Sequence, residues 1–173
     1  RPYIFAFIFV IVFLIGEPLI KIFERRQISG PIRQDGPIDH IIKKSGTPTM
    51  GGLIIIFGIF LGTLLWADLK NIYILVVIFV SLSLGLLGFS DDLLKIKLKN
   101  SRGLNSKLKF LGQFLIGSIA IFILSKFSNH EHLNNLYFPF FKNAALYMGV
   151  FFIPFALFVI VGSSNAVNLT DGL

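Results

Sequence analysis

Long, nearly uninterrupted apolar runs constrain this 173-residue chain more than any other feature of its sequence. The runs lack the periodic stripe of a soluble amphipathic helix, and their lengths match those of segments that cross a bilayer. The composition agrees, because 54% of the residues are hydrophobic, only 14% are charged and the mean hydropathy is +0.79. We therefore predict an all-α fold, namely a polytopic integral membrane helical bundle with about five transmembrane helices in a single membrane domain.

Polar segments alternate with the apolar runs and set the predicted topology. The regions from Lys21 to Thr49 and from Ser90 to Lys109 together hold 12 of the 16 Lys and Arg residues. By the positive-inside rule both regions face the cytoplasm, and so does the segment after the fifth span. The cytoplasmic loops are thus predicted at residues 24–49, 90–109 and 162–173, and the spans at residues 3–23, 50–66, 72–89, 110–127 and 146–161.

Charge and residue usage exclude several classes of function. The net charge of +7 is compatible with nucleic-acid binding, but its confinement to two loops fits membrane topology better, so no nucleic-acid partner is expected. The chain has no Cys, which excludes disulfides and thiolate metal sites. His40, His130 and His132 are not predicted to form a ligand set, because the last two lie in a loop on the predicted outer side.

The second cytoplasmic loop begins with two adjacent carboxylates, Asp91 and Asp92, and six cations follow them. Paired acids at the mouth of a span, backed by cations, suit metal-assisted handling of phosphate. A plainer interpretation is that Ser90 caps a helix whose first turn holds both acids, where the helix dipole favours them. Lys95 lies within reach of either acid on a helix. We expect both carboxylates to face water and to contribute little to folding.

The other two cytoplasmic segments carry hydroxyl and amide groups. Residues 44–52 read KSGTPTMGG, and their Thr and Gly residues could offer donors to phosphate or sugar, although the Thr-Pro-Thr could equally cap the second span. Asn165, Asn168 and Asp171 recur every three residues, so on a helix they would form one polar stripe at the end of the fifth span. A solvated tail is the plain alternative for this stretch.

Three motifs, KSGTPTMGG, GFSDDLLKIK with GLNSKLKF, and NAVNLTDGL, follow one another on one predicted membrane face. In that order they resemble the phospho-N-acetylmuramoyl-pentapeptide transferase family, within the polyprenyl-phosphate N-acetylhexosamine-1-phosphate transferase superfamily. The resemblance implies transfer of phospho-N-acetylmuramoyl-pentapeptide from UDP-N-acetylmuramoyl-pentapeptide to undecaprenyl phosphate, which releases UMP and forms the first lipid intermediate of peptidoglycan synthesis. It further implies Mg²⁺ as cofactor, membrane lipid around a multi-pass protein of the bacterial inner membrane, an active face on the cytoplasmic side, and it allows a homodimer.

The same resemblance implies roles for individual residues. Asp91 and Asp92 match the family's aspartate pair, which is implicated in acceptor activation and in organising metal or phosphate. The implied catalytic residues are Asp91, Asp92, Lys95 and Lys109, with Lys107 as the alternative to Lys109. The implied substrate-binding residues are Lys44, Thr49, Asn165 and Asn168, and the implied metal-binding residues are Asp171 and Asp92.

The chain departs from the family in length. Members are longer, and they carry more spans, a later metal-binding aspartate and a histidine-rich motif that this sequence lacks. We therefore expect the chain to be an N-terminal fragment of the enzyme that is inactive alone. Two other functions stay open: a sister transferase that moves N-acetylglucosamine-1-phosphate onto the same lipid, and a non-catalytic membrane transporter or lipid-binding module.

Overall fold

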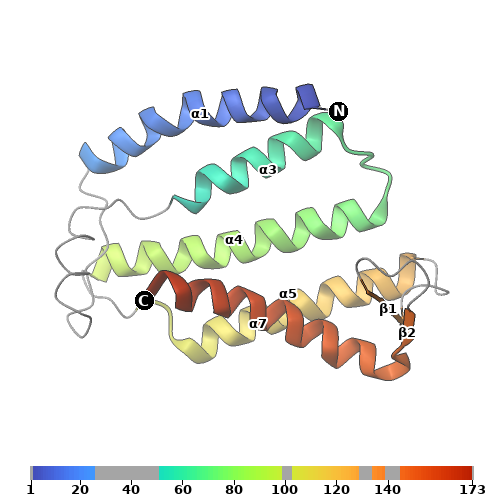
Figure 1. Ribbon diagram of the computed structural model, residues 1–173. Coiled ribbons are helices and arrows are strands. Elements are labelled where there is room, and N and C mark those ends of the chain that lie inside the picture. Colours follow the sequence, from blue (N-terminus) through green and yellow to red (C-terminus); the bar gives the residue numbers. More distant parts are fainter. Residues whose placement is uncertain (1, 26–50, 99–102, 129–133, 139–144, 173) are drawn as a thin grey trace. The chain divides into compact units, whose positions relative to one another are not determined.

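The computed structural model describes residues 2–25, 51–98, 103–128, 134–138 and 145–172 (Figure 1). Within these ranges the chain forms five α-helices, a short 3-10 turn and one pair of three-residue strands, so the predicted all-α class is confirmed. The helices are α1 (Pro2–Arg25), α3 (Gly52–Trp66), α4 (Ile72–Leu98), α5 (Ser106–Phe127) and α7 (Phe152–Gly172).

The helices have the character of membrane spans. Three described segments, Ile72–Leu98, Ser106–Phe127 and Gly149–Ala166, are long and apolar enough to cross a bilayer, and α3 is apolar but shorter. Many large apolar side chains on these helices are exposed, among them Phe122, Phe155 and Phe158. Lipid solvates such surfaces, so the chain is a multi-pass membrane protein. The predicted count of five spans and their orientation stay predictions.

The described residues gather into two compact units. Unit 1 comprises Arg1–Asp68 and Ser81–Lys109, which include α1, α3, the second part of α4 and the first residues of α5. Unit 2 comprises Leu69–Val80 and Phe110–Leu173, which include the first part of α4, most of α5, both strands and α7. The packing within each unit is described separately below.

In unit 1, α1 and α3 pack side by side in opposite directions (Figure 1). Gly58 faces α1 so closely that a Cβ atom there would lie 2.8 Å from the side chain of Val12, and Gly62 meets the same helix one turn later. Near the end of α3 the rings of Phe7 and Trp66 meet edge to face, with centroids 5.4 Å apart. Small residues that let backbones approach are the usual basis of helix association in membranes.

Two helices extend into the second predicted cytoplasmic loop (residues 90–109), beyond the ends of the predicted spans. α4 continues past residue 89 to Leu98, and α5 begins at Ser106 rather than at residue 110. Residues 90–98 carry Leu and Lys, which are good helix formers, together with acid–lysine pairs spaced for ion pairing along a helix. Charge therefore ends an apolar run here without ending the helix.

A strand pair precedes α7 in unit 2, and its second strand overlaps the start of the span predicted at residues 146–161. Strand β1 (Asn135–Tyr137) pairs antiparallel with β2 (Ala145–Tyr147), so that Leu136 lies opposite Leu146. A 3-10 turn at Gly149–Phe151 then leads into α7, and Gly149 adopts the left-handed conformation with φ +52°. Three-residue strands are too short for an alternating pattern to reveal them.

Candidate functional site

The acid pair lies near the C-terminal end of α4, so the interpretation of Ser90 as a helix cap is wrong. The Ser90 hydroxyl instead donates to the carbonyl of Leu86 one turn earlier, at 2.8 Å. Asp91 and Asp92 are followed by nearly two further turns of helix. At this distance from either end of α4 the helix dipole does not stabilise the carboxylates, so other groups must do so.

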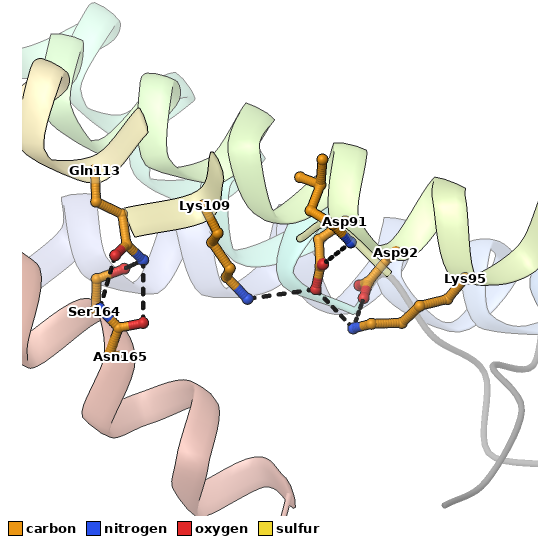
Figure 2. A network of polar contacts seen from close by, with 8 residues as sticks. Asp91, Asp92, Lys95, Lys109, Gln113, Ser164 and Asn165 are labelled. Atoms are coloured by element: carbon orange, nitrogen blue, oxygen red, sulfur yellow. Dashed lines mark hydrogen bonds and ion pairs between the residues drawn. The ribbon is translucent and has the colours of Figure 1, made fainter. Parts of the chain in front are cut away.

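Asp91 is almost completely buried, with 5% of its surface exposed, and three groups donate to it (Figure 2). The backbone N–H of Leu104 donates to Oδ1 at 2.8 Å. The Nζ atoms of Lys95 and Lys109 lie 2.8 Å and 3.3 Å from Oδ2. A buried carboxylate is stable only when it is paired and hydrogen-bonded in this way. The expectation that both acids face water is therefore wrong for Asp91.

Asp92 occupies a different environment one residue later. Its side chain is 31% exposed, and its Oδ1 accepts a hydrogen bond from Lys95 at 3.0 Å. Lys95 thus bridges both carboxylates (Figure 2), while the side chain of Asp92 stays partly exposed. We call Asp91, Asp92, Lys95 and Lys109 the acid–lysine network.

The start of α5 determines which lysine meets the acids. The side-chain Oδ1 of Asn105 accepts the N–H of Lys107 at 3.0 Å, and its carbonyl accepts the N–H of Lys109 at 3.0 Å. Asn105 therefore caps α5 and fixes the direction of its first turn. Lys109 then reaches across to Asp91 within unit 1, whereas the Lys107 side chain is exposed. Of the two lysines considered from the sequence, the structure brings Lys109 to the acids.

A second polar network joins α5 to α7 inside unit 2 (Figure 2). Gln113 is 1% exposed, and its Oε1 accepts a hydrogen bond from Nδ2 of Asn165 at 2.7 Å, while its Nε2 donates to Ser164 Oγ at 3.2 Å. Nδ2 of Asn165 also donates to the Val161 carbonyl at 2.8 Å, so both of its N–H groups are engaged. Sequence reasoning missed Gln113, although an amide inside an apolar span was the available signal.

The remaining predicted site residues are only partly covered. Asn168 and Asp171 lie on the backbone of α7, which continues through this stretch to Gly172, but the structure does not describe their side chains. Lys44 and Thr49 lie outside the described residues, as do all three histidines. Among the residues that are described, no three His, Asp or Glu side chains gather closely enough to hold a metal ion.

An apolar groove of about 500 Å³ lies between α1, α3 and α4 in unit 1. Its lining includes Leu19, Ile56, Leu86 and Phe89, and it contains almost no polar surface. Phe89 precedes Asp91 by two residues on α4, so one wall of the groove leads along this helix toward the acid–lysine network.

Comparisons with known proteins identify related sequences over the whole chain. The family model described as glycosyl transferase family 4 matches residues 72–173, and phospho-N-acetylmuramoyl-pentapeptide-transferase signature 1 matches residues 44–56. Curated relatives named phospho-N-acetylmuramoyl-pentapeptide-transferase occur in Pelagibacter ubique (56% identical over 163 residues), Orientia tsutsugamushi (48% over 166) and Borrelia turicatae (45% over 170). These alignments cover 94%, 95% and 98% of this chain but only 45%, 46% and 48% of the relatives. The chain therefore spans about half the length of the curated relatives it matches.

Proposed function

The chain belongs to glycosyl transferase family 4, and from this premise we propose that the full-length protein transfers phospho-N-acetylmuramoyl-pentapeptide from its UDP-linked donor to undecaprenyl phosphate. UMP is released, and the first lipid intermediate of peptidoglycan synthesis is formed at the cytoplasmic face of the bacterial inner membrane. The observation that carries this proposal is that the acid–lysine network lies inside the segment that the family model matches. The signature match at residues 44–56 and the names of the curated relatives support the choice of donor.

The proposed reaction is a phosphoryl transfer between two anionic substrates. An oxygen of the lipid phosphate attacks the phosphorus that carries the sugar, and a new P–O bond forms. The bond from that phosphorus to the bridging oxygen of UMP breaks, so UMP leaves with the electron pair. Catalysis of such transfers rests mainly on positioning and on stabilising the charge of the phosphoryl oxygens. Lys95 and Lys109, which the network holds in place, are the proposed cationic groups.

The charge balance of the network supports a metal cofactor. Its two ammonium groups are matched by two carboxylates, so phosphates that approach need a further cation. Mg²⁺ is usually bound by one or two carboxylates and by substrate phosphates, and when bound it would neutralise charge on the phosphoryl oxygens. Asp92 suits this role, because its carboxylate is partly exposed and Lys95 meets one oxygen. Asp171, on α7 in unit 2, is a further proposed metal-binding residue on the resemblance alone.

The apolar groove of unit 1 supports a membrane-embedded acceptor. Its lining is almost entirely apolar, which suits a prenyl chain and not the UDP-linked donor. A lipid that lies in the groove would have its phosphate near Phe89, and Asp91 and Lys95 follow on the same helix.

The donor is proposed to contact four other residues, namely Lys44, Thr49, Asn165 and Asn168. Because both side-chain N–H groups of Asn165 are engaged, this residue would act through Oδ1, which also accepts a hydrogen bond from Nε2 of Gln113 at 3.5 Å.

A donor-selectivity assay tests the proposal. Membranes that contain the full-length protein are given undecaprenyl phosphate and either UDP-N-acetylmuramoyl-pentapeptide or UDP-N-acetylglucosamine, each labelled in the sugar. We expect lipid-linked label and UMP in equal amounts from the first donor only. Product from UDP-N-acetylglucosamine would indicate the sister transferase. Binding of the lipid without UMP release from either donor would indicate a transporter or lipid-binding module.

A further inference from the structure

The turn at residues 103–105, directly before α5, begins with Gly103. No other residue type can replace this glycine without displacing neighbouring atoms. Gly103 has φ +56°, a left-handed conformation that residues with a Cβ atom adopt rarely. Space is a second restriction, because a Cβ atom at this position would collide with Oδ1 of Asp91 and would lie 2.9 Å from Cε of Lys95. Both conformation and space therefore require glycine next to the acid–lysine network.

The turn holds Asp91 from the side opposite its own helix. Gly103 directs the backbone so that the next N–H, that of Leu104, donates to Oδ1 of Asp91 at 2.8 Å. The following residue, Asn105, caps α5, from whose first turn Lys109 reaches Oδ2 of the same carboxylate at 3.3 Å. A carboxylate fixed at both oxygens by separate elements cannot change its orientation without disturbing the turn.

We propose that Gly103 is a positioning residue for the transferase reaction. Because it has no side chain, it lets the backbone close over Asp91, and it thereby fixes the ammonium groups of Lys95 and Lys109. Lys95 also contacts Asp92 at 3.0 Å, so a displacement of Asp91 reaches the exposed carboxylate as well. This inference rests on the proposed function and deepens it, since it assigns a role to a residue that has no reactive group.

Substitutions at the turn test the inference in the full-length protein. Gly103→Ala is expected to lower kcat by about 10- to 100-fold, because small displacements of catalytic groups have effects of this size. Gly103→Asn separates conformation from space, since Asn tolerates positive φ but still carries a Cβ atom. We expect Asn to be impaired like Ala, and turnover near the wild-type value in Gly103→Asn would overturn the role of space. Gly88→Ala is the matched control on α4, where an added Cβ atom meets nothing within 4 Å.

A double-substitution cycle tests whether Gly103 acts through Asp91. In an Asp91→Ala background the colliding oxygen is gone, and only the positive φ and the contact with Cε of Lys95 remain. Gly103→Ala is therefore expected to lower the remaining turnover by a smaller factor than it does beside Asp91. Radiolabelled donor keeps the low rates measurable. A turn that matters only for folding would lower turnover by the same factor in both backgrounds, and that result would overturn the proposal.

The same cycle in thermal unfolding separates this inference from the proposed function. If the wild-type protein makes no lipid-linked product, the proposed function fails, but the unfolding midpoints still decide the role of Gly103. Gly103→Ala is expected to lower the midpoint more beside Asp91 than beside Asp91→Ala, where only the cost of the positive φ and the contact with Cε of Lys95 remain. Equal decreases would overturn the inference, as would a Gly103→Ala protein that does not fold and is not recovered by Asp91→Ala.

Discussion

Replacement of Asp91 and of Asp92, one at a time, by asparagine is expected to separate folding stability from turnover. The two residues are neighbours in sequence, but the structure gives them different surroundings. Asp91 is 5% exposed and faces two ammonium groups and a backbone N–H, whereas the Asp92 side chain is 31% exposed and faces Lys95. Asp91→Asn removes the carboxylate that Lys109 faces and leaves Lys95 paired with Asp92 alone, whereas Asp92→Asn removes one partly exposed ion pair.

The magnitudes follow from this difference in burial. Removal of one partner from a fully buried ion pair lowers the free energy of unfolding by about 3–5 kcal/mol. Because the Lys95 and Lys109 side chains are 26% and 16% exposed, water compensates part of the loss, and we expect about 2–3 kcal/mol for Asp91→Asn. Exposed pairs contribute roughly 0.2–1 kcal/mol, which is the range expected for Asp92→Asn.

The assay measures both properties on the same purified full-length protein. Asp91→Asn should lower the thermal unfolding midpoint by about 2–4 °C, because 1 kcal/mol corresponds to roughly 1–1.5 °C in a protein about twice the length of this chain. Asp92→Asn should leave the midpoint nearly unchanged, and both variants should lose at least about 100-fold in turnover. Glu17→Gln is the control, because Glu17 forms an exposed ion pair with Lys21 at 2.6 Å on α1. Equal midpoints for both aspartate variants would contradict the stabilising role of the buried Asp91. Near-normal turnover in both would contradict the role of the two acids in the reaction.

Three further predictions concern other parts of the chain. Gln113→Leu should lower the unfolding midpoint by an amount that corresponds to about 1–3 kcal/mol, because it leaves the Asn165 amide without its buried partner. The control is Ser106→Ala at an exposed site, and equal midpoints for the two variants would contradict this prediction. Single cysteines that replace Ser45 and Ser101 should react with an impermeant thiol reagent only from the cytoplasmic side. A cysteine that replaces Leu69, which is 40% exposed, should react only from outside. The opposite labelling pattern would reverse the predicted topology. The 173 residues expressed alone should form no lipid-linked product. A chimera in which these residues replace the matched segment of the Pelagibacter ubique relative should form the product. Product from the 173 residues alone would show that the remaining part of such a protein is dispensable.

Local features of the structure could be predicted from the sequence. Apolar runs determine the all-α class, because only helices satisfy their own backbone hydrogen bonds in lipid. The ion pairs of Lys95 with Asp91 and Asp92 follow from the spacing of four and three residues on a helix. Each of these inferences depends on residues within two turns of one another.

Features that depend on distant residues could not be predicted. The burial of Asp91 requires the chain to return after α4, so that the N–H of Leu104 and the ammonium group of Lys109, 13 and 18 residues away, meet one carboxylate. The partnership of Gln113 with Asn165 joins residues 52 apart. α4 and α5 extend beyond the predicted spans, because charge marks where an apolar run stops, while the helix itself continues as long as its residues favour helix.

The most direct test of the account is the amount of lipid-linked product formed from UDP-N-acetylmuramoyl-pentapeptide and undecaprenyl phosphate by the full-length protein, compared with its Asp92→Asn variant at equal protein level. With the wild-type protein we predict one UMP for each lipid-linked product, and neither product when Mg²⁺ is chelated. In the variant we predict at least about 100-fold less UMP and lipid-linked product. No product from folded wild-type protein would contradict the proposed transferase, and undiminished product from Asp92→Asn would contradict the assignment of the site to the acid–lysine network.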